Sequence, residues 1–209
     1  MLVVGIPGPA LDADTHVALR ALRPGAVALF RRNGRRARTA AGPGRGAASP
    51  ALRPLVAIDH EGGRVTRLGP PFTAFPAAAV LARAGRAATR AVGEAIGREL
   101  ASVGIDVDFA PVLDVGSDRE AGALGDRLFG NDPSTVAEMA LAFAAGLAAA
   151  GVLPCGQALS RLRRVGARRS RRPPGGGGDA HPTAGPRPRA LPRGRRLPLL
   201  MTAHVRRPA

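Results

Sequence analysis

PLVAIDHEGGRVTRLGPPFTAFP, residues 54–76, is the stretch that decides the predicted fold. It begins with four apolar residues, 55–58, a run of the length expected for a buried strand. Charged residues and a glycine pair follow without a break: Asp59, His60, Glu61, Gly62, Gly63 and Arg64. In open α/β sheets and in barrels, ligands bind at the C-terminal ends of parallel strands. The pattern therefore predicts a site at the end of this strand, and the alternative is a solvated, salt-bridged loop.

Apolar runs and helical patterns alternate along the rest of the chain. Strands are expected near 2–6, 26–30, 55–58, 106–109, 152–155 and 199–203, and helices near 12–23, 89–103 and 133–150. The last helix has the clearest start, because Asp132 can cap it and Pro133 suits its first position. Strands that alternate with helices predict a parallel α/β fold. At 209 residues the chain is short for a complete (β/α)₈ barrel, which takes about 250.

Two segments break this alternation. Residues 34–52 and 157–196 are rich in glycine, proline and arginine, and they carry no apolar stripe with which a helix could pack on a sheet. Both segments are expected to be irregular, because neither buries enough apolar surface to offset the entropy lost on ordering it.

The net charge of +16 makes nucleic acid the first partner to consider. Residues 31–53 carry +7 and residues 156–209 carry +13, while the remainder of the chain carries −4. All basic residues are arginine, as GC-rich coding produces, and only 3% of residues are aromatic and able to stack on bases. The sequence thus argues against nucleic acid. A basic protein that binds nucleic acid or an acidic surface without catalysis remains the alternative function.

Three ordered blocks resemble one known family. They are IDHEGGRV at 58–65 with FT at 72–73 and FP at 75–76, GIDVDFAPVLDV at 104–115, and LGDRLFGNDP at 124–133. Together they are similar to the family-three glycoside hydrolases, and among these to the bacterial β-N-acetylhexosaminidases. The resemblance implies a partial TIM (β/α)₈ barrel of parallel strands, in which residues 1–209 form a single incomplete N-terminal barrel domain.

The resemblance also implies a function, which is retaining hydrolysis of terminal β-linked N-acetylglucosamine, of the type that recycles peptidoglycan fragments. Asp59 would accept hydrogen bonds from sugar hydroxyls, and Arg67 and Arg127 would donate to the sugar, because a planar guanidinium suits paired hydroxyl contacts. For each arginine the alternative is a surface salt bridge. His60 and Glu61 are interpreted as residues that brace the loop.

The catalytic residues that the resemblance implies have no counterpart in the sequence. Relatives place Lys-His-Phe-Pro-Gly directly after the strand near 152–155, where this chain reads QALSR at 157–161. One extra C ahead of the codons AAG CAC TTT CCC GGN yields that pentapeptide, so 157–196 is interpreted as translated out of frame. The family's Asp-x-His pair is thereby lost, since His181 lacks its spacing, and the resemblance places the nucleophile beyond Ala209. No catalytic residue is assigned, and the chain is expected to be inactive.

The remaining expectations concern three single residues, bound groups, cellular location and partners. Asp114 is interpreted as a strand-end cap, His204 either lines the site or is structural, and the lone Cys155 is expected in the core. The resemblance implies neither a cofactor nor a metal ion. The sequence has no apolar run of membrane-spanning length and no signal peptide, which predicts a cytoplasmic protein with a carbohydrate as partner and no membrane association.

Overall fold

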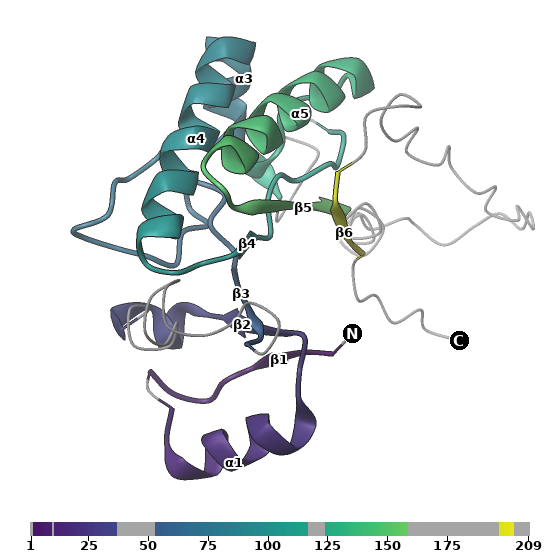
Figure 1. Ribbon diagram of the computed structural model, residues 1–209. Helices are drawn as coiled ribbons and strands as arrows, with labels where there is room; N and C mark the ends of the chain where they lie inside the picture. Colours follow the sequence, from purple (N-terminus) through teal and green to yellow (C-terminus); the bar gives the residue numbers. More distant parts are fainter. Residues whose placement is uncertain (1, 10, 37–52, 117–123, 159–196, 203–209) are drawn as a thin grey trace, which may run out of the picture.

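The computed structural model describes residues 2–9, 11–36, 53–116, 124–158 and 197–202. Within them, six strands form one parallel sheet in the order of the sequence: β1 (Val3–Gly5), β2 (Ala26–Leu29), β3 (Leu55–Ile58), β4 (Val107–Asp108), β5 (Leu153–Ala158) and β6 (Leu199–Thr202). The register sets Ile58 of β3 beside Asp108 of β4, so these two strands end at the same level. The sheet curls into half of a barrel (Figure 1), which confirms the predicted parallel α/β fold and partial barrel.

The described helices are α1 (Ala13–Leu22), α3 (Ala78–Ala84), α4 (Arg86–Ser102) and α5 (Pro133–Ala149), with short 3₁₀ turns η1 (Arg31–Arg36) and η2 (Gly125–Arg127). Figure 1 shows α3, α4 and α5 grouped together, and α1 apart from them near β1. As predicted, α5 begins at Pro133, and the Asp132 carboxylate accepts a hydrogen bond from the Thr135 backbone N–H at 2.8 Å. None of the described helices combines the length and the apolar character needed to span a bilayer.

The two faces of the sheet bury different side chains. On β3, Val56 and Ile58 belong to the main core between sheet and helices, whereas Ala57 lies with Val107 and Cys155 on the concave face. Side chains alternate across a strand, so the residues that follow β3 are expected to continue this division. Asp59, the first residue after β3, therefore falls on the concave face, and His60, the second, falls on the helix side.

Three predicted boundaries are wrong by a few residues, and the first is the start of α4, which lies at Arg86 and not near 89. Residues 34–36, expected to be irregular, continue the 3₁₀ turn η1. The strand β5 includes Gln157 and Ala158, because both pair with β6, and because Gln157 N donates to Pro111 O at 2.8 Å and Leu113 N donates to Gln157 O at 2.7 Å. The remaining parts of the two segments, 37–52 and 159–196, lie outside the described residues.

Candidate functional site

A tight turn after β3 brings charged side chains together at the end of the strand. Gly62 and Gly63 have φ values of +87° and +56°, which favour glycine, and a Cβ on Gly62 would lie only 2.5 Å from Pro76 O. Glu61 N donates to Val65 O at 2.9 Å and closes the turn. The chain therefore reverses direction within a few residues, and Arg67 comes back over the residue that follows β3.

Asp59 and Arg67 form the more open part of the site. Arg67 Nη2 donates to Asp59 Oδ2 at 2.9 Å, and the two side chains keep 25% and 19% of their surface exposed. Arg67 Nε is buried and has no hydrogen-bond partner among the described residues. A buried donor without a partner is unfavourable, and the atoms of this pair that a ligand can reach are those on its partly exposed surface.

Beside this pair, Glu61, Arg127 and Gln157 form a buried cluster, called here the Glu61 cluster. Arg127 donates from Nε to Glu61 Oε2 at 2.8 Å and from Nη2 to Glu61 Oε1 at 2.7 Å. Gln157 Nε2 donates to the same Glu61 Oε1 at 2.8 Å. The paired geometry of a guanidinium and a carboxylate fixes both groups in orientation. Residues from the end of β3, from η2 and from β5 are thus joined at one end of the sheet.

The electrostatics of Arg127 show that the carboxylates of the site act on it together. Burial alone would lower the pKa of Arg127, but the hydrogen bonds and charge of Glu61, with the charges of Asp59 and Asp114, raise this pKa above its ordinary value. Arg127 is therefore a permanent cation held among acidic groups.

Below the site, on the helix side of the sheet, lie two buried titratable groups. His60 N donates to Asp108 Oδ1 at 2.9 Å, and Arg67 N approaches His60 Nδ1 at 3.4 Å. Burial lowers the pKa of His60 to about 4, against the charge of Glu99, which raises it, and with a smaller lowering contribution from the charge of Arg67. Burial raises the pKa of Asp108 well above its usual range. At neutral pH the His60 side chain is therefore uncharged, burial favours the protonated form of Asp108, and the two residues support the turn from below.

All three predicted site residues, Asp59, Arg67 and Arg127, lie at this end of the sheet, and each arginine is ion-paired with a carboxylate of the same site. Asp114 is buried after β4, and His204 lies outside the described residues. The sequence reasoning missed Gln157 as a member of the site. Its position two residues after Cys155 on one strand, and hence on the same face, was the signal that could have revealed it.

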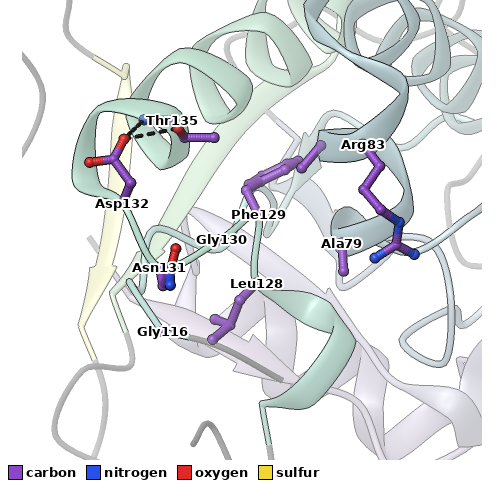
Figure 2. A pocket seen from close by; sticks show the side chains of 10 residues that line it. Ala79, Arg83, Gly116, Leu128, Phe129, Gly130, Asn131, Asp132 and Thr135 are labelled. Carbon is purple, nitrogen blue, oxygen red and sulfur yellow. Dashed lines mark hydrogen bonds between the residues drawn. The ribbon is translucent and has the colours of Figure 1, made fainter. Parts of the chain in front are cut away.

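A hollow of about 400 Å³ lies next to the site but is not lined by the predicted residues. Figure 2 shows Arg83 of α3 on one side of it, and Asp132 and Thr135 at the start of α5 on the other. Leu128 and Phe129, which directly follow Arg127, form part of its wall. Within the described part of the chain, no group of three His, Cys, Asp or Glu side chains is arranged to hold a metal ion.

Comparison with known proteins places this geometry in a family. Residues 21–157 match the model of the glycosyl hydrolase family 3 N terminal domain. The chain belongs to this family. The match includes all three predicted site residues, and the resemblance stated from the three sequence blocks is confirmed.

Curated relatives and solved structures agree with this assignment. The β-hexosaminidase of Methylococcus capsulatus is 40% identical over 160 residues, covering 72% of this chain and 46% of its own, and that of Tolumonas auensis is 36% identical over 160 residues, covering 75% and 47%. The crystal structure of NagZ from Neisseria gonorrhoeae in complex with N-trifluoroacetyl-D-glucosamine superposes with a TM-score of 0.66 at 34% identity, covering 74% of this chain and 49% of that one. The chain spans about half the length of the curated relatives that it matches.

Proposed function

We propose that this chain recognises a terminal β-linked N-acetylglucosamine residue at the ends of β3 to β5, as a β-N-acetylhexosaminidase-type domain. The observation that supports this most directly is the meeting of Asp59, Arg67 and Arg127 at one end of the sheet, in a chain of glycosyl hydrolase family 3. Relatives carry the name β-hexosaminidase, and one solved relative holds a glucosamine derivative. We propose a glycan derived from peptidoglycan as the ligand and the cytoplasm as the location.

Each of the three residues has a distinct role in this proposal. Asp59 accepts hydrogen bonds from sugar hydroxyls, and its pairing with Arg67 holds both groups partly exposed. Arg67 donates to the sugar from the exposed part of its guanidinium, since its Nε is buried. Arg127 has Nε and Nη2 occupied by Glu61, which leaves Nη1 as the group that donates to the sugar.

We further propose that the chain binds without hydrolysing. A retaining glycosidase needs a nucleophile and a proton donor on opposite sides of the scissile bond. Where relatives place Lys-His, this chain has Gln157 and Ala158, and Gln157 is engaged in the Glu61 cluster. The family match ends at Gln157, which supports a change of reading frame at that point. Of the two arginine-rich segments that motivate the nucleic-acid alternative, 31–53 and 156–209, the parts 37–52, 159–196 and 203–209 lie outside the described residues.

The test uses binding and turnover on the same preparation. Isothermal titration of the chain with N-acetylglucosamine is expected to show saturable binding that Asp59→Asn weakens at least tenfold, because the amide loses charged acceptor capacity. Hydrolysis of an aryl β-N-acetylglucosaminide is expected to be absent. Deleting one base ahead of the Gln157 codon, in a gene that encodes the complete barrel, is expected to restore it. Absence of sugar binding would refute the recognition proposal, and turnover by the chain that Asp59→Ala abolishes would refute the loss of catalysis.

A further inference from the structure

The backbone of Gln157 is fixed from both sides of its strand. Its N–H and C=O are bonded to the segment after β4, at Pro111 O and Leu113 N, with distances of 2.8 and 2.7 Å. On the other side β5 pairs with β6, where Gln157 lies opposite Met201. The residue is only 3% exposed. The side chain therefore starts from a rigid point on the concave face, and its direction is set by the sheet.

The amide of this side chain is used up within the protein. Its Nε2 group donates to Glu61 Oε1 at 2.8 Å and also to Phe109 O, so both amide hydrogens are engaged. Its Oε1 lies 3.5 Å from Arg127 Nη2. No donor remains for a ligand, and the residue is buried, so the amide N–H groups of Gln157 act on other protein groups.

The group on which it acts is the carboxylate of Glu61. Glu61 Oε1 accepts from Gln157 and from Arg127 at once, and Glu61 Oε2 accepts from Arg127. Rotation of the carboxylate would break both contacts with Arg127, and the hydrogen bond from Gln157 opposes this rotation. Gln157 supplies this hydrogen bond without adding a charge to the cluster, whereas an anion at this place would repel Glu61.

We propose that Gln157 is a positioning residue that locks the Glu61 carboxylate and, through it, orients Arg127 for ligand binding. This inference rests on the proposed function for its consequence in binding, but the effect on Arg127 is a property of the protein alone. The two can therefore be measured separately. Asp59 and Asp114 are the other charged groups that act on Arg127, and neither accepts from Gln157 among the hydrogen bonds of the described residues.

The primary experiment follows the Nε–H of Arg127 by ¹H–¹⁵N NMR in the full chain, because this group donates to Glu61. Gln157→Met keeps the length of the side chain and removes its hydrogen bonds. We expect solvent exchange of the Arg127 Nε–H to accelerate about tenfold, the factor typical of one lost hydrogen bond to a charged group. Affinity for N-acetylglucosamine should fall by a similar factor. The matched control is Cys155→Ala, which lies on the same strand and face and should leave Arg127 exchange unchanged.

A second variant separates positioning from a purely structural role and remains informative if Gln157→Met fails to fold. In Gln157→Glu, the introduced carboxyl can donate to Glu61 only when it is protonated. Because hydroxide catalyses this exchange in both proteins, the readout is the ratio of the Arg127 Nε–H exchange rate in the variant to that in the wild type, which should rise as the introduced carboxyl loses its proton. Unchanged Arg127 exchange in both variants would overturn the positioning role. If exchange changes as expected while the wild-type chain binds no sugar, the positioning role stands and the proposed function fails.

Discussion

Replacing Gly146 by alanine is expected to force α4 and α5 apart. The two helices meet along glycines, and a Cβ built on Gly146 would lie 2.5 Å from Glu94 N and 2.9 Å from Gly93 C, with Arg90 O also in its way. All three are backbone atoms of α4, so no side-chain rotation can make room. The glycine of α4 is packed as closely against α5, since a Cβ built on Gly93 would clash with the backbone oxygen of Phe143.

The size of the effect follows from these distances. Carbon atoms in proteins normally keep about 3.5–4.0 Å from such neighbours, so the axes would have to separate by about 1 Å. Overpacking of this kind typically costs about 1–3 kcal/mol and sometimes more, and the higher helix propensity of alanine returns about 1 kcal/mol. Because the clash is with backbone on a face that includes the buried Ile96, Phe143 and Leu147, we expect a net loss near 2 kcal/mol.

Urea unfolding followed by circular dichroism measures this loss. With a slope of about 2 kcal/mol per molar urea, the midpoint should fall by about 1 M. Gly69→Ala is the matched control, since a Cβ there meets nothing within 4 Å, and its midpoint should move little. A Gly146→Ala protein as stable as the wild type would refute the close approach of the two helices.

Three further predictions concern groups around the site. Burial lowers the pKa of His60 to about 4. The contribution of His60 to the free energy of unfolding is therefore complete above its unfolded pKa of about 6.5, and about 3 kcal/mol is lost as the pH drops toward 4. Urea titrations over this pH range should show that His60→Asn loses less stability than the wild type. Burial raises the pKa of Asp108, and the effect on stability has the opposite pH dependence. The contribution of Asp108 to the free energy of unfolding is present below about pH 3.8 and is lost as the pH rises. Asp108→Asn should therefore gain stability relative to the wild type between pH 4 and 7, and a flat difference over that range would contradict the buried acid. Thr73 donates from Oγ1 to Glu99 at 2.5 Å, so Thr73→Val should cost about 0.5–1 kcal/mol and speed hydrogen exchange in the loop 69–76, whereas unchanged exchange would argue against this tie.

The elements that could be predicted are those with local signals. The helix α5 was predicted because Asp132 and Pro133 mark its start and apolar residues follow at helical spacing. The strand β3 was predicted from four apolar residues before a charged turn. The helix α3 was not predicted, because it has only seven residues and Ala77 gives no side-chain cap. A helix so short depends on packing against its neighbours, which a local pattern does not reveal.

The sequence by itself determined the family, the parallel order of strands and helices, and the three candidate binding residues, because motifs and periodicities lie within short stretches of chain. Only the tertiary structure decided how those residues are held. Glu61 meets Arg127 across 66 positions and Gln157 across 96, and no local pattern records such a pairing. Because the parallel strands end side by side, their ends bring these distant residues into one cluster, in which a neutral amide aligns a carboxylate with an arginine.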